Sequence, residues 1–146
     1  MPDIFVINGP NLNMLGTREP EIYGSHTLDQ INRELAAAAQ PLGLSLHFFQ
    51  SSHEGALVDE IHRIYTTSPG GVIINPGGLT HTSVVLRDAL AMLTCPKVEV
   101  HLSNIYKREP FRHTSLLSDI VLGQITGFGH FGYHMALMAL HRHLSV

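Results

Sequence analysis

Residues 4–11 read Ile4-Phe5-Val6-Ile7-Asn8-Gly9-Pro10-Asn11, and they decide the fold because they join a short apolar run to a long broken loop. A run of four such residues is typical of a strand buried on both faces, as in a parallel sheet. The loop continues to Gly24 and holds three glycines, two prolines and three asparagines between residues 8 and 24. Most connections in compact domains run about 4–6 residues, so a loop of this length indicates a functional segment.

Further apolar runs outward from this stretch predict four more strands, at Leu44–Phe49, Val72–Asn75, Val98–Leu102 and Ile120–Ile125. Helical patterns lie between them. Thr27 and Gln30 have the spacing of a capping box ahead of an apolar stripe, and the stretch Ser51–Glu54 offers a second box. Two more helices are expected from about 82 to 93 and from about 130 to 143, whereas residues 105–118 give no clear pattern.

This alternation of strands and helices predicts a parallel sheet with right-handed crossovers. The 146 residues favour one domain, and five strands favour a flavodoxin-like, doubly wound α/β fold. In such folds ligands bind beyond the carboxyl ends of the strands. Polar side chains gather there: a segment from Asn75 to Thr82 follows the third strand, and Glu99, His101, Ser103, Arg108 and Arg112 lie at or after the fourth.

Composition excludes several classes of protein. The formal net charge is −3 with only 9 Lys+Arg, so the basic footprint of a nucleic-acid binder is absent. No apolar run is long enough for a transmembrane helix, and the first residues lack the basic segment of a signal peptide. A single cysteine, Cys95, allows no disulfide within the chain. These features lead us to expect a soluble cytoplasmic protein.

Gly127–Gly132 matches the dinucleotide-binding pattern G-x-G-x-x-G, after a predicted strand and before a predicted helix. Only fourteen residues follow it, however, so the acidic residue expected about 20 positions further on has no place. We therefore favour a tight strand-to-helix turn. A flavodoxin-like module that binds a nucleotide or flavin without catalysis stays as the alternative function.

Two pairs of residues could carry proton chemistry. Glu99 and His101 lie at i and i+2 of a strand and share one face, so the carboxylate could orient the ring; a merely structural pair is equally consistent with the spacing. Arg18 and Tyr23 lie in the long loop. A guanidinium at about 4 Å stabilises a phenolate by roughly 4 kcal/mol at an effective dielectric of 20, which makes tyrosinate accessible as a base.

Three long motifs in this order resemble the type II 3-dehydroquinate dehydratases over nearly the whole chain: Asn8–Gly24, Asn75–Asp88 and Glu99–His113. The resemblance implies dehydration of 3-dehydroquinate to 3-dehydroshikimate by β-elimination through an enolate, with no metal and no cofactor. It gives Tyr23 the role of base and Arg18 that of its activator. His101 becomes the general acid, held by Glu99, and Asn11 stabilises the enolate oxygen.

The resemblance also implies the substrate contacts. Backbone N–H groups of Leu102 and Ser103 would bind the carboxylate, and further contacts would come from Asn75, His81 and Arg112. Asp88 would serve the site of a neighbouring subunit, in a dodecamer of four trimers.

Residues 11–24 would form a lid over the active site. One departure stands out: Ser52 replaces the asparagine that the family commonly has after the second strand.

Overall fold

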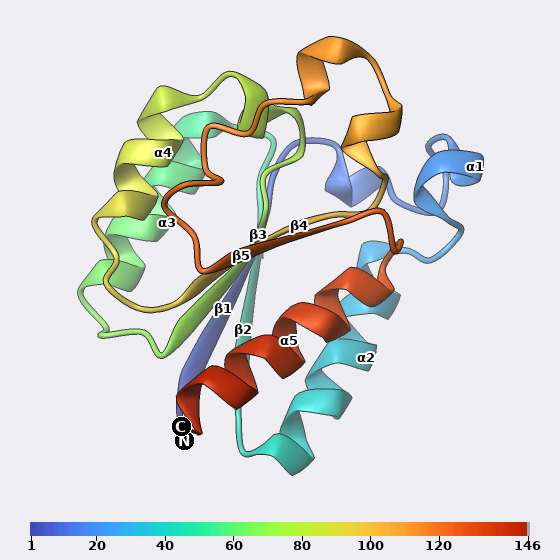
Figure 1. Cartoon of the computed structure of the whole chain (residues 1–146). Helices are drawn as coiled ribbons and strands as arrows, with labels where there is room; N and C mark the ends of the chain where they lie inside the picture. Colours follow the sequence, from blue (N-terminus) through green and yellow to red (C-terminus); the bar gives the residue numbers. More distant parts are fainter. Residues whose placement is uncertain (146) are drawn as a thin grey trace.

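The computed structural model describes residues 1–145 and shows one sheet of five parallel strands in the order β2-β1-β3-β4-β5. The strands are β1 (Asp3–Asn8), β2 (Ser45–Gln50), β3 (Gly71–Asn75), β4 (Lys97–His101) and β5 (Gly123–Thr126). The α-helices are α1 (Pro20–Tyr23), α2 (Leu28–Ala39), α3 (Glu54–Tyr65), α4 (Val84–Ala91) and α5 (Phe131–Leu144). Helices α2 and α5 cover one face of the sheet, and α3 and α4 cover the other (Figure 1). The predicted single-domain, doubly wound α/β fold is confirmed.

The alternation of side chains along β1 explains why both faces are covered. Ile4 and Val6 enter the core formed with α2 and α5, whereas Phe5 and Ile7 enter the core formed with α3 and α4. A strand that is apolar at every position must be covered on both sides, because neither face can be left to water. The strand in the middle of the sheet, β3, is buried along its whole length.

The starts of α2 and α3 test the two capping boxes predicted from the sequence. The capping box of α2 is confirmed, since Thr27 accepts from the Gln30 N–H at 3.2 Å and the Gln30 side chain accepts from the Thr27 N–H at 2.8 Å. The second box is wrong. Helix α3 begins at Glu54 without a side-chain cap: the Ser51 hydroxyl accepts from the His53 N–H at 3.0 Å, and the Glu54 carboxylate accepts from Ser83 of the α4 N-terminus at 2.5 Å.

The fifth strand begins later than the sequence predicts, at Gly123 instead of Ile120. At Ile120 the chain is still turning, with its N–H bonded to the carbonyl of Leu117 at 3.0 Å. Ile120 and Val121 pack against the core on the α3–α4 side, so their apolar character reflects loop packing and not strand pairing.

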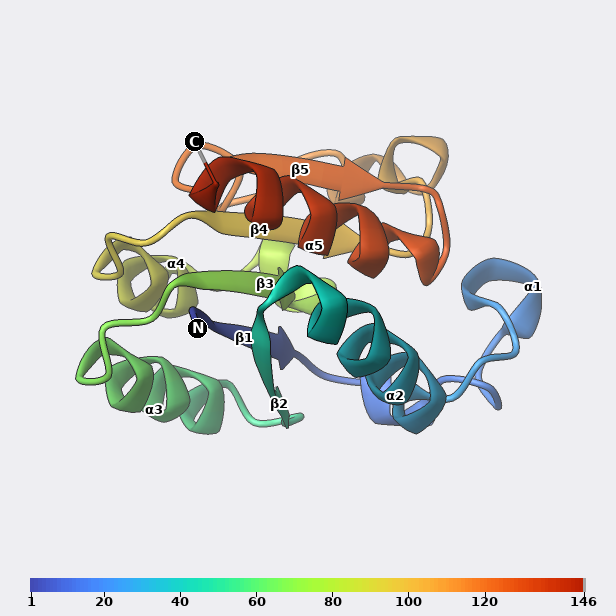
Figure 2. The same ribbon diagram turned by 90° about the horizontal axis from the view of Figure 1, so that it is seen from below.

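The sheet topology creates a crevice between β1 and β3. The chain leaves β1 toward its neighbour β2 on one side and returns later as β3 on the other, which makes their carboxyl ends a topological switch point. These strands point toward the side of the molecule where α1 lies (Figure 2). Two glycines bring the following loops together: a Cβ at Gly9 would lie 2.5 Å from the Pro76 carbonyl oxygen, and one at Gly77 would lie 2.9 Å from that of Pro10.

Within residues 1–145, no helix combines the length and the apolar character needed to cross a membrane.

Candidate active site

A cavity of about 230 Å³ opens at this switch point, where the segments after β1, β3 and β4 converge. It is smaller than the roughly 300–1,000 Å³ usual for drug-sized ligands, so it suits a small, single-ring molecule. Nine of the residues expected to carry function line it: Asn11, Arg18, Tyr23, Asn75, His81, His101, Leu102, Ser103 and Arg112.

The segment from residue 11 to residue 24 forms the outer wall of the cavity. It is more ordered than its glycines and prolines suggested, because it contains the short 3-10 helix η1 (Leu12–Met14) and the single turn α1. Leu12 and Leu15 are buried and fasten its first half to the core. The Arg18 guanidinium lies 4.7 Å from the centre of the Tyr23 ring, so the sequence-predicted pair is in contact.

Arg108 follows β4, as its position in the sequence predicts, and it is a further residue of this site with no role expected from the sequence. Its Nη1 donates to the Tyr23 hydroxyl at 2.9 Å and to the Ser103 hydroxyl at 3.1 Å. The guanidinium of Arg18 therefore lies over the Tyr23 ring, and that of Arg108 is hydrogen-bonded to the Tyr23 oxygen. The only signal in the sequence was the position of Arg108, a cation shortly after β4 in a chain with few charges.

Glu99 and His101 form a buried ion-pair-like contact behind the cavity wall. The His101 Nε2 donates to Glu99 Oε2 at 2.5 Å, and both side chains are almost fully buried. Thr80 donates to the same carboxylate at 2.6 Å and Ser115 at 2.8 Å. Burial alone would raise the pKa of Glu99, but these hydrogen bonds and the charge of His101 outweigh it and hold the pKa below its ordinary value.

Because Nε2 of His101 is engaged by Glu99, Nδ1 is the ring nitrogen left to exchange a proton with a ligand. Glu99 itself does not line the cavity. Its contact is with His101, and a carboxylate in this position fixes the tautomer and the ring orientation of the histidine.

Asn75, at the end of β3, is held by a second buried network. Its Nδ2 donates to the Tyr133 hydroxyl at 3.0 Å, its Oδ1 accepts from the Gly77 N–H at 3.2 Å, and Tyr133 in turn donates to Asn8. Tyr133 is fully buried on α5, and burial raises its pKa, so the hydroxyl stays protonated as this network requires. No local pattern in the sequence predicts this partnership.

The charge of the cavity wall is positive. Arg18, Arg108 and Arg112 line it, and no aspartate or glutamate among the described residues does. Glu109 at the rim offsets part of this charge, since it accepts from Arg112 Nε at 3.1 Å. The site therefore favours an anion. His81 completes the wall; its Nδ1 donates to the carbonyl of Thr114 at 2.8 Å.

Asp88 is the one substrate-binding candidate that the structure does not bring to this cavity. It lies exposed on α4, outside the cavity lining.

The glycine-rich turn at residues 127–132 uses two of its glycine N–H groups to bond the segment at the end of β4. The Gly127 N–H donates to the carbonyl of His101 at 3.2 Å, and the Gly129 N–H to that of Leu102 at 2.9 Å. These bonds tie the start of α5 to the end of β4, which supports a strand-to-helix turn and not a phosphate cradle.

Comparison with known proteins agrees with this geometry. The family model described as "Dehydroquinase class II" matches residues 2–141. A 3-dehydroquinate dehydratase of Bordetella avium is 58% identical over 140 residues, covering 96% of this chain and 97% of that protein. One from Acaryochloris marina is 54% identical over 144 residues, covering 99% of this chain and 96% of that protein.

A solved structure, the type II dehydroquinase from Propionibacterium acnes, superimposes with a TM-score of 0.94 at 41% identity and covers 97% of each chain. The family model and the relatives match nearly the full length of this chain, and the solved structure has the same fold. The chain belongs to the class II dehydroquinase family.

Proposed function

We propose that this chain catalyses the reversible dehydration of 3-dehydroquinate to 3-dehydroshikimate, by a metal-free anti β-elimination through an enolate. The observation that carries the proposal is the convergence of Tyr23, with two guanidiniums, and His101, with a buried carboxylate, on one small cationic cavity. An elimination beside a ketone requires a base and an acid that can both reach one bound ligand the size of a single ring. The names of the curated relatives point to the same reaction.

Tyr23 is the proposed base. The guanidinium of Arg18 lies over its ring, and the hydrogen bond from Arg108 fixes the oxygen that would take the proton from the carbon next to the ketone. The electron pair of that C–H bond then moves into the enolate. Asn11 lines the same cavity and is proposed to stabilise the enolate oxygen as charge develops there.

His101 is the proposed acid. Its imidazolium, supported by Glu99, gives a proton to the hydroxyl on the β-carbon as the enolate collapses, and water leaves with the C–O electron pair. The product therefore gains one carbon–carbon double bond and one molecule of water is released. General acid–base catalysis of this kind contributes typically 10²–10⁴-fold.

The cationic lining supports an anionic substrate. We propose that the N–H groups of Leu102 and Ser103 bind the substrate carboxylate together with Arg112, and that Asn75 and His81 bind its hydroxyls. Among residues 1–145, three guanidiniums and no carboxylate line the cavity, which disfavours a divalent metal ion there and supports a reaction that uses no metal.

Two further proposals concern the surroundings of the site. Residues 11–24 act as a lid that closes over the bound substrate and excludes water. The chain assembles as a dodecamer of four trimers, in which the exposed Asp88 contacts the site of a neighbouring subunit. The same reaction serves either shikimate biosynthesis or quinate breakdown.

The experiment is to mix chelator-treated protein with 3-dehydroquinate and follow ultraviolet absorbance. The product contains a carbon–carbon double bond conjugated to its ketone, whereas the substrate has no such enone. We expect a catalytic rise in absorbance that the chelator does not reduce. A flat trace from folded protein would reject the proposed activity, and a rise abolished by the chelator would reject the metal-free mechanism.

A further inference from the structure

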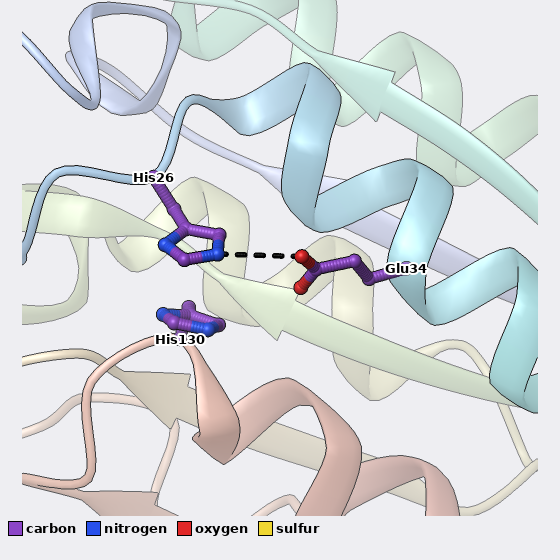
Figure 3. A group of neighbouring side chains, drawn as sticks. All are labelled: His26, Glu34 and His130. Carbon is purple, nitrogen blue, oxygen red and sulfur yellow. Dashed lines mark ion pairs between the residues drawn. The ribbon is translucent and has the colours of Figure 1, made fainter.

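A cluster of potential metal ligands lies outside the cavity, where three segments meet. His26 stands between the lid and α2, Glu34 is on α2, and His130 immediately precedes α5 (Figure 3). One ligand atom from each lies within 4.8 Å of the others. None of the three lines the cavity at the switch point, so the cluster is separate from the proposed chemistry.

The contacts within the cluster are close, and the two stacked rings must turn toward each other before their in-plane nitrogen lone pairs can meet at one ion. His26 Nε2 lies 3.3 Å from Glu34 Oε1, and the rings of His26 and His130 stack with centroids 4.0 Å apart and planes at 25°. Around a tetrahedral zinc ion with bonds of about 2.0–2.1 Å, neighbouring ligand atoms are separated by about 3.4 Å. The His26–Glu34 distance already has this value.

The ligand types select the class of metal. Two imidazoles and one carboxylate suit zinc and its neighbours among the divalent transition metals, whereas magnesium and calcium prefer oxygen ligands throughout. The side chains of His26 and Glu34 are 37% and 46% exposed, so an ion could enter from solvent and keep a water molecule as its fourth ligand.

The stacking of His26 on His130 also needs a physical explanation. Two imidazoliums at this distance would repel each other. A neutral imidazole is the form that binds a metal. Glu34 supplies the one negative charge that draws a cation to the pair.

We infer that His26, Glu34 and His130 form a binding site for one divalent transition-metal ion of the zinc class. Its effect is structural. His26 follows the last lid residue, Gly24, by two positions, so the ion joins the end of the lid to α2 and to the start of α5.

The test is a titration of chelator-treated protein with Co²⁺, followed by its visible absorption, and with Zn²⁺, followed by calorimetry. We expect one ion per chain and the strong visible bands of a low-coordinate Co²⁺ ion. His26→Asn and His130→Asn should weaken binding by at least the roughly 10–100-fold that loss of a partner outside the coordination sphere costs. Glu34→Gln should act in the same direction.

His134→Asn is the matched control, because His134 lies one helical turn beyond His130 but outside the cluster. It should leave the stoichiometry and the affinity unchanged. Binding that survives in the His26→Asn/His130→Asn double variant, or that His134→Asn weakens equally, would overturn the assignment. Far-ultraviolet circular dichroism of each variant confirms that it is folded.

A second readout concerns the link to the lid. Saturating Zn²⁺ should slow hydrogen exchange in residues 16–27 of the wild-type protein and leave the same segment unchanged in His130→Asn. Equal exchange with and without the ion in the wild type would contradict the proposed connection. Neither measurement depends on catalysis, so its outcome is independent of the proposed dehydration.

Discussion

Replacing Glu99 by Gln removes one charge from the buried pair and keeps the shape of the side chain. The glutamine carbonyl can take the place of Oε2, which accepts from His101 and Thr80. Its NH₂ group can take the place of Oε1 and donate to the Ser115 hydroxyl, whose proton is free to rotate. The variant should therefore fold, with only the support for the His101 imidazolium weakened.

The size of the effect follows from the environment of the pair. Glu99 is fully buried, so solvent does not screen its charge. A hydrogen bond to a charged group contributes about 1.5–3 kcal/mol. At about 1.36 kcal/mol per factor of ten, its loss lowers kcat by roughly 10- to 160-fold. KM should change little, since Glu99 does not line the cavity.

The assay is the initial rate of enone formation from 3-dehydroquinate, with kcat and KM measured separately. Thr80→Val is the matched control, because it removes one hydroxyl donor at 2.6 Å from the same carboxylate but leaves the charge. We expect it to lower kcat by less than Glu99→Gln does, because the carboxylate keeps its charge and its other donors, His101 and Ser115. A Glu99→Gln enzyme within twofold of the wild type would refute the reasoning, and so would equal losses in the two variants.

Three further predictions concern Tyr133, Arg108 and Glu99. Tyr133→Phe leaves the Asn75 amide without its partner and should lower the free energy of unfolding by about 1–3 kcal/mol in urea denaturation; an unchanged midpoint would contradict this. Arg108→Ala removes the donor to the Tyr23 hydroxyl and should lower kcat by at least about tenfold, whereas full activity would show that Arg18 alone suffices. The pKa of Glu99 is held below its ordinary value of 4.5, so the stability that its charge contributes is present above that pH and is lost as the pH falls further. Glu99→Gln should therefore lose less stability than the wild type below about pH 4.5. Parallel plots of unfolding free energy against pH for the two proteins would contradict this linkage.

The sequence predicted the sheet and its helices because their apolar periodicities are long and unambiguous. The late start of β5 was missed because an apolar residue in a packed loop, such as Ile120, looks the same as one in a strand. The gathering of Asn75, His81 and His101 was predictable, since parallel strands bring their carboxyl ends to one edge.

Partnerships between distant segments could not be predicted in the same way. The contact of Arg108 with Tyr23 spans 85 positions, and that of Tyr133 with Asn8 spans 125. Neither follows from local spacing, because both depend on how α1 and α5 pack against the sheet.

Tyr23, held by two guanidiniums, is the proposed base of the reaction. The most direct measurement is kcat for Tyr23→Phe, which keeps the ring under Arg18 and removes only the hydroxyl that Arg108 contacts. We predict a fall of about 10²–10⁴-fold with substrate binding retained, as expected for loss of a general base. A rate within a few-fold of the wild type would contradict the account and require another base in the cavity.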